Sequence, residues 1–184
     1  MNILVTYFSQ TGNTETVAKA ICDECATVGT ADLKRLKDIT PNDMARYDFI
    51  FVGSPLHAGR LAAPMQEYLR QLRSTSGQKM AGFITHFAAA YPEQSMEGFA
   101  EPIKTACKKN GIEFRGCFDC QGALSERLHG VVQKKLNATD EAWAEMLSQM
   151  TGHPNAEDKD RARAFARKMM DANRPREDRP STTT

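Results

Sequence analysis

Short apolar runs alternate with amphipathic stretches along this chain, and that alternation limits the fold more than any other feature. Residues 2–8 and 47–53 are the clearest runs, and each has the length and composition of a buried strand. Between such runs, apolar residues recur at helical spacing, as in Met65, Leu69 and Leu72. Continuous apolar strands separated by helices are typical of a parallel sheet that helices cover on both faces. The sequence therefore predicts an α/β fold.

The order of these elements leaves few topologies, because crossovers between parallel strands are right-handed. We expect a single domain over residues 1–172, with residues 121–155 as a helical extension. Residues 173–184 carry no large apolar side chain and are expected to form a disordered tail. The expected strands are residues 2–8, 30–36, 47–53, 79–86 and 112–118, and the expected helices are 12–27, 62–73, 95–110, one beginning near 139–141 and a last one capped by Asn155.

Length and charge exclude several classes of protein. The chain has 184 residues, which fits one domain, and its 24 basic and 23 acidic residues leave a formal charge of +1. That balance argues against a polybasic nucleic-acid binder. No apolar run approaches the roughly 18 residues of a membrane span. The first residues show no signal-peptide pattern, so we expect a cytoplasmic protein.

Cysteines and histidines give weak signals for metal or redox chemistry. Cys22 and Cys25 form one CxxC pair, and Cys117 and Cys120 form another. Four such thiols could bind zinc, but the pairs are far apart in the sequence, and an odd cysteine count favours reduced, packed thiols. The four histidines lack ligand spacing, and His129 and His153 look incidental. We therefore predict no metal site.

The sharpest motif is the SQTGNT segment at residues 9–14, which follows an apolar strand and opens an amphipathic helix. Backbone N–H groups and the helix dipole at such a position favour a phosphate. Gly12 allows a tight turn, and the hydroxyls of Ser9, Thr11 and Thr14 can donate further hydrogen bonds. The segment is neither a Walker A loop nor a GxGxxG fingerprint. A well-capped Ser/Thr-rich turn is the alternative interpretation.

A second motif, GSPLHAGR, occupies residues 53–60 directly after another apolar strand. In a sheet of order 2-1-3-4-5, the first and third strands are neighbours at the topological switch point. Ligands of such sheets bind there, outside the carboxyl ends of the strands. The two motifs are therefore expected to reach one crevice.

With these motifs and their spacing, the chain resembles the flavodoxin family. The resemblance rests on the first strand, the SQTGNT segment and FIFVGSPLHAG. It covers about residues 1–120 and extends to the closing helix around residues 156–170. It implies a three-layer fold with a five-stranded parallel sheet of order 2-1-3-4-5. It also implies non-covalent binding of FMN and electron transfer between redox partner proteins.

The same resemblance assigns the cofactor-binding residues. It implies that the FMN phosphate is cradled by Ser9, Gln10, Thr11, Gly12, Asn13 and Thr14. It implies that the flavin ring runs along Ser54, Pro55, Leu56, His57, Ala58 and Gly59, with Ala58–Gly59 as the peptide that can flip. The segment after the fourth strand adds Thr85, His86, Phe87 and Tyr91. Phe87 is alternatively a core aromatic. Cys117–Gly122 could form a floor near the same crevice, in which Cys120 either touches the flavin or only packs, and packing is favoured.

Two features depart from the family pattern. His57 stands where many flavodoxins have an aromatic residue on the ring, and it could stack on the flavin or donate a hydrogen bond to it. Arg60 could favour a negatively charged reduced flavin. Many flavodoxins are strongly acidic, so the charge of +1 puts docking to basic partners in doubt.

Three functions are weighed. The first is an FMN-dependent electron carrier, monomeric or weakly dimeric, without a nucleic-acid or membrane partner and without catalytic residues of its own. The second is an FMN-dependent oxidoreductase on the same fold, either an NAD(P)H/quinone reductase or a protoporphyrinogen-oxidase-like enzyme. The third is a receiver or a small tyrosine phosphatase, which the sequence disfavours because it lacks clustered strand-end carboxylates and a C-x5-R loop.

Overall fold

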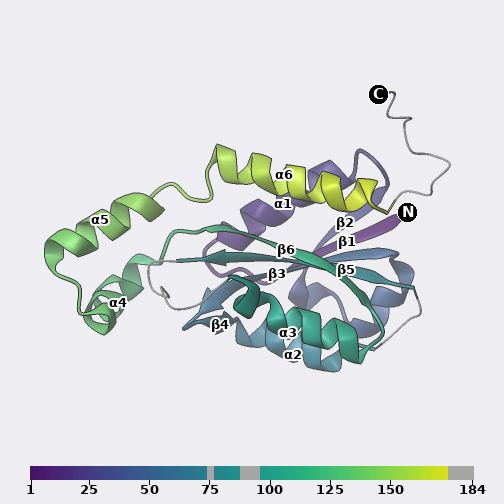
Figure 1. Cartoon of the computed structure of the whole chain (residues 1–184), viewed down its shortest axis with the longest axis horizontal. Coiled ribbons are helices and arrows are strands. Elements are labelled where there is room, and N and C mark those ends of the chain that lie inside the picture. Colours follow the sequence, from purple (N-terminus) through teal and green to yellow (C-terminus); the bar gives the residue numbers. More distant parts are fainter. Residues whose placement is uncertain (74–76, 88–95, 174–184) are drawn as a thin grey trace.

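A computed structural model describes residues 1–73, 77–87 and 96–173 (Figure 1). The strands are β1 (Asn2–Tyr7), β2 (Thr30–Arg35), β3 (Phe49–His57), β4 (Arg60–Leu61), β5 (Lys79–His86) and β6 (Glu113–Gln121). The α-helices are α1 (Asn13–Cys25), α2 (Ala63–Gln71), α3 (Met96–Lys109), α4 (His129–Leu136), α5 (Asp140–Met150) and α6 (Ala156–Asp171). Short 3-10 helices cover Leu36–Asp38, Pro41–Arg46 and Glu126–Leu128.

Five parallel strands form the sheet in the order β2-β1-β3-β5-β6. This is the expected 2-1-3-4-5 order, so the predicted topology is confirmed. The two-residue β4 was not expected, and it pairs antiparallel with β3 through Leu56–Leu61 and His57–Arg60. Helices α1 and α6 cover one face of the sheet, and α2 and α3 cover the other (Figure 1).

The alternation of side chains along β3 explains why this strand is apolar throughout. Phe49 and Phe51 pack under α1 and α6, whereas Ile50 and Val52 pack under α2 and α3. All four side chains are fully buried. A central strand buried on both faces reads as a continuous hydrophobic run, and this run was therefore visible in the sequence.

The third strand is longer than predicted, and this corrects the expectation of a loop after Gly53. Ser54 and Pro55 continue the parallel ladder opposite Ile84 and Thr85, and the strand ends at His57. Likewise the last strand runs to Gln121, three residues past its predicted end. Pairing with a neighbouring strand outweighs the low strand propensity of the Gly-Ser-Pro segment.

Residues 122–155 form a small structure of their own beside the sheet, in which α4 and α5 lie beyond the carboxyl ends of the strands (Figure 1). Trp143 and Met150 are buried there with Phe87, and the rings of Phe87 and Trp143 meet edge to face at 6.2 Å. The sequence predicted a helical extension over residues 121–155 but no separate helix at the position of α4. His129, which looked incidental, begins this helix and packs its ring 5.8 Å from that of Trp143.

None of the helices in the described part of the chain is long and apolar enough to cross a membrane.

Candidate functional site

A cavity of about 380 Å³ lies at the carboxyl edge of the sheet, where the segments after β1, β3, β5 and β6 come together. Its walls combine polar groups from the first helix turn with apolar groups from β3 and α4. The lining residues are Ser9, Gln10, Thr11, Asn13, Thr14, Pro55, Leu56, His57, Ala58, Thr85, His86, Phe87, Gly122, Ala123, Leu124, Ser125, Leu128, Val131, Val132, Lys135 and Leu136.

Most of the residues that the sequence singled out meet at this cavity. The predicted residues among its lining are Ser9, Gln10, Thr11, Asn13, Thr14, Pro55, Leu56, His57, Ala58, Thr85, His86 and Phe87. Gly12, Ser54 and Gly59 do not line it. Tyr91 lies outside the described residues.

The three predicted residues that do not line the cavity shape its surroundings. Gly12 precedes α1 with a φ of 92°, a conformation that glycine adopts without strain. The buried Ser54 hydroxyl accepts a hydrogen bond from the Ala62 amide at 2.9 Å, which ties β3 to the start of α2. Gly59 and Ala58 have φ values of 76° and 49° and form the turn between β3 and β4.

The first turn of α1 has no side-chain cap, unlike α5 and α6. Within the turn, the Gly12 amide donates to Ser9 Oγ at 3.1 Å, and the Gly12 carbonyl accepts from the Thr16 amide. Amide groups at a helix start carry partial positive charge and seek an acceptor. This end of α1 is therefore a place where an anion would be stabilised.

Two hydrogen bonds fasten the start of α1 to the opposite walls of the cavity. Thr14 and Thr85 are both buried, and their hydroxyl oxygens lie 2.8 Å apart. The Asn13 side-chain amide donates to the Ala123 carbonyl at 2.7 Å. These contacts hold the segments after β1, β5 and β6 in one fixed arrangement.

His57 lies at the edge of the cavity on the last residue of β3. Its ring meets that of Phe8 edge to face, with centroids 6.2 Å apart. Partial burial lowers the pKa of His57 below its usual value, because the charged imidazolium loses hydration there. A neutral imidazole at this edge can stack on a planar ligand or exchange a hydrogen bond with it.

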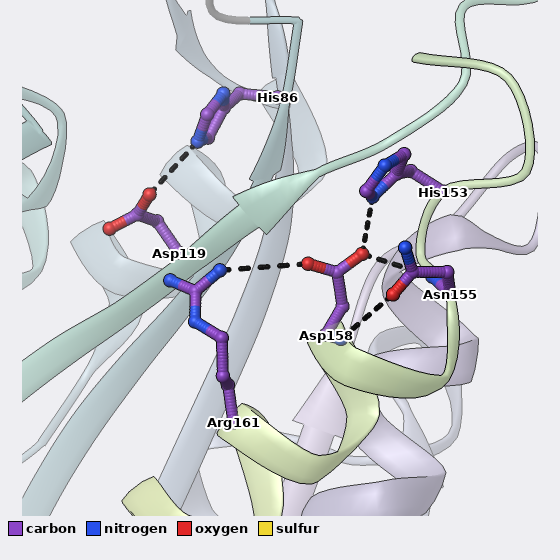
Figure 2. A network of polar contacts seen from close by, with 6 residues as sticks. All are labelled: His86, Asp119, His153, Asn155, Asp158 and Arg161. Atoms are coloured by element: carbon purple, nitrogen blue, oxygen red, sulfur yellow. Dashed lines mark hydrogen bonds and ion pairs between the residues drawn. The ribbon is translucent and has the colours of Figure 1, made fainter. Parts of the chain in front are cut away.

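His86 sits deeper, at the end of β5. Its Nε2 lies 3.0 Å from Oδ2 of Asp119 on β6, whose side chain is 36% exposed (Figure 2). The other ring nitrogen, Nδ1, is buried and has no hydrogen-bond partner among the described residues. A buried nitrogen without a hydrogen bond destabilises the folded protein, so a ligand that forms a hydrogen bond with it would stabilise the fold.

A second polar cluster supports the wall formed after β6. The buried Asp158 carboxylate accepts from the Asn155 amide at 2.9 Å and lies 2.5 Å from His153 Nδ1 (Figure 2). The His153 carbonyl in turn accepts from the Ala123 amide at 3.2 Å. His153, which looked incidental in the sequence, thus links the cap of α6 to a cavity residue.

The cysteines play no part in the cavity. Burial raises the pKa of Cys25, Cys107, Cys117 and Cys120 to about 12, which keeps these thiols protonated and unreactive. All five cysteines are free thiols. Among the described residues, no group of three or more His, Cys, Asp or Glu side chains could hold a metal ion.

Sequence reasoning missed the wall that α4 contributes. Leu128, Val131, Val132, Lys135 and Leu136 line the cavity at spacings of three, four, seven and eight residues. This spacing marks one face of a helix. This spacing could have indicated the helix from the sequence. The segment is short, however, begins with His-Gly and carries few apolar residues, so the pattern is weak.

Comparisons with known proteins agree with this geometry. A family model described as a flavodoxin domain matches residues 4–167. The flavodoxin-like domain-containing protein BilS of Clostridioides difficile is 28% identical over 179 residues, which cover 92% of this chain and 97% of BilS. An NAD(P)H dehydrogenase (quinone) of Gluconacetobacter diazotrophicus is 33% identical over 103 residues, 45% of this chain, and the match spans half of that relative's length.

Solved structures show the same fold at lower identity. Oxidised flavodoxin 2 from Bacillus cereus superimposes with a TM-score of 0.66 and 19% identity, covering 94% of this chain and 99% of that one. The Streptococcus pneumoniae TIGR4 flavodoxin gives a TM-score of 0.58 and 18% identity, with 81% and 99% covered.

Proposed function

Because this chain belongs to the flavodoxin domain family, we propose that it binds FMN in the cavity and carries electrons between redox partner proteins. Members of the family bind flavin and pass electrons to partner proteins. The observation that carries the proposal is the uncapped start of α1, which opens into a cavity also bordered by residues 55–58 and 85–87.

The donor groups present fit FMN. The first turn of α1 and the segment before it offer backbone amides and the hydroxyls of Ser9 and Thr11 to a phosphate, and no carboxylate lines the described part of the cavity. His86 Nδ1 is a buried nitrogen at the same cavity, and no group in the described part of the chain pairs with it. Apolar groups from Pro55, Leu56 and Phe87 suit a flat aromatic ring.

Each wall would have a separate task. Residues 9–14 would bind and orient the phosphate, and His57 would lie at the edge of the ring. Gly59, with its positive φ, would let the Ala58–Gly59 peptide change orientation. When bound, FMN supplies the electron-carrying chemistry, and the protein supplies binding, orientation and electrostatics.

The placement of the phosphate is tested by Thr11→Glu, measured by quenching of flavin fluorescence during titration with FMN. The new carboxylate would repel the phosphate, and we expect at least about a 100-fold loss of affinity. Thr27→Glu is the matched control, because Thr27 is exposed just beyond the other end of α1. It should leave FMN affinity unchanged. Full affinity in Thr11→Glu would contradict the proposed site.

A second candidate function is an FMN-dependent oxidoreductase that acts on a small substrate. It is favoured by the relatives named NAD(P)H dehydrogenase (quinone), although this chain spans only 50% and 62% of two of them. The visible spectrum of the FMN-loaded protein, recorded without oxygen, separates the two functions. Bleaching within seconds of adding NADH or NADPH supports the oxidoreductase. An oxidised spectrum that persists supports the carrier.

A further inference from the structure

Two apolar side chains stand exposed at the rim of the cavity. Leu128 is 47% exposed and Val131 is 65% exposed, and among the described residues only Met1 joins them as a large exposed hydrophobic residue. Both also line the cavity. Their neighbours Val132 and Leu136 also line the cavity, but these two side chains pack against the small core around Trp143. One side of α4 is thus anchored, and the other presents aliphatic groups to solvent.

Unpaired positive charges flank these two residues. Arg127, Lys134 and Lys135 are exposed, and none forms an ion pair with another described residue. Val131 lies four residues after Arg127 and three before Lys134. It also lies three residues after Leu128 and four before Lys135. Val131, Lys134 and Lys135 lie on α4 itself, where residues three and four apart are neighbours on one surface, and Arg127 and Leu128 end the 3-10 helix that leads directly into α4. We call these five residues the α4 face.

The surrounding charges favour a negatively charged partner. Glu126 is the nearest acidic residue in sequence, and the acidic residues of α5, Asp140 and Glu141, begin the next helix. From residue 126 to residue 136, three cations therefore stand against one carboxylate. Aliphatic groups bordered by unpaired cations match a protein surface that carries carboxylates around an apolar centre.

We propose that the α4 face is the docking surface for an acidic redox protein. The inference rests on the proposed function and extends it by naming the kind of partner. Leu128, Val131 and Lys135 belong both to this face and to the cavity, so a partner seated on it would lie next to a bound flavin. Charge complementarity of this kind raises the association rate and fixes the orientation of the partners.

The test uses a plant-type [2Fe–2S] ferredoxin, an acidic one-electron donor, with the FMN-loaded protein. In the measured step one electron leaves the reduced iron–sulfur cluster and enters the flavin, and stopped-flow absorbance follows it. Lys134→Gln/Lys135→Gln should lower the second-order rate constant at low salt by about fivefold or more. Added salt should lower the rate constant of the wild-type protein toward that of this variant, because salt screens the attraction between the partners.

A matched control is available within the chain. Lys108 and Lys109 are also consecutive exposed lysines in the last turn of a helix, α3, but they lie at the amino edge of the sheet, away from the cavity. Lys108→Gln/Lys109→Gln has the same change in net charge and should keep the wild-type rate. Equal rates in the two variants would overturn the proposal, as would a loss of FMN affinity that accounts for the whole effect of Lys134→Gln/Lys135→Gln.

Direct binding separates this proposal from the proposed function. Surface plasmon resonance can measure how tightly the same ferredoxin binds to the protein without added flavin. Weaker binding to Val131→Asp than to the wild-type protein supports the docking surface even if FMN does not bind. Undetectable ferredoxin binding to the wild-type protein, together with normal FMN binding, refutes the docking surface and leaves the flavin site intact.

Discussion

Single side chains decide how closely the strands beneath the cavity can approach one another. A Cβ atom on Gly53 would lie 2.1 Å from two carbons of the Phe83 ring, and that ring is fully buried. Gly53 therefore permits β3 and β5 to pair at the point where the site begins. Close to it, the buried Thr14–Thr85 pair holds α1 against β5.

Gly53→Ala is expected to lower the free energy of unfolding by about 3 kcal/mol, because the added Cβ would overlap the fully buried Phe83 ring and force it to shift within the core. Urea denaturation followed by circular dichroism measures the change. The control is Gly130→Ala in α4, where an added Cβ meets nothing within 4 Å. That change should be neutral or stabilise the protein by up to about 1 kcal/mol. Similar losses in both variants would contradict the packing argument.

Thr14→Val and Thr85→Val should each destabilise the protein by about 1–3 kcal/mol, since each leaves the other hydroxyl buried without its partner. The double variant should be more stable than the sum of the two single losses predicts, because no unpaired hydroxyl remains. Urea denaturation of the flavin-free wild-type protein, the two single variants and the double variant gives the four free energies of this double-mutant cycle. Strictly additive losses would show that the two hydroxyls do not interact.

His57 is expected to make the free energy of unfolding depend on pH. Its pKa is lower in the folded protein than in the unfolded chain, so the unfolded chain binds more protons as the pH falls through the usual histidine range. His57 therefore costs stability under acidic conditions and costs none at alkaline pH. His57→Gln should gain stability relative to the wild-type protein when the pH is lowered from about 8 to about 5. A stability difference that is independent of pH would contradict this account.

At the scale of elements, the helix starts divide into those with a side-chain cap and those without one. Asn155 caps α6, and Thr139 caps α5. The start of α1 at Gly12 has no such side chain, nor do the starts of α2 and α4, and residues of the first turn of α1 line the cavity. A helix start without a side-chain cap forgoes some stability, and an anion bound there would restore it.

Asn155→Ala tests the capped case. Asn155 accepts from the Asp158 amide at 3.0 Å, and the buried Asp158 carboxylate accepts in return from the Asn155 amide. Loss of the side chain should cost about 1–2 kcal/mol in thermal or urea unfolding. Thr139→Ala removes a longer cap bond of 3.3 Å on an exposed helix start, and it should cost less. The reverse order would show that the reciprocal pair adds nothing.

At the scale of the whole molecule, the sequence predicted those features of the fold that depend on local hydrophobic patterns. The buried strands and amphipathic helices set the sheet order, and the segments at 9–14 and 53–60 met at one edge because that order makes β1 and β3 neighbours. The continuation of β3 through Ser54 and Pro55 could not be predicted, since it depends on pairing with β5. The α4 wall was missed because its core, around Trp143, is built from residues distant in sequence, including Phe87.

The most direct test of the central claim compares FMN with riboflavin, which has the same ring but no phosphate. Titration of each into the wild-type protein, followed by flavin fluorescence, gives the affinity and the stoichiometry. If the start of α1 holds the phosphate, one FMN will bind per chain, and riboflavin will bind at least about tenfold more weakly. Equal affinities, or no flavin binding at all, would contradict the account.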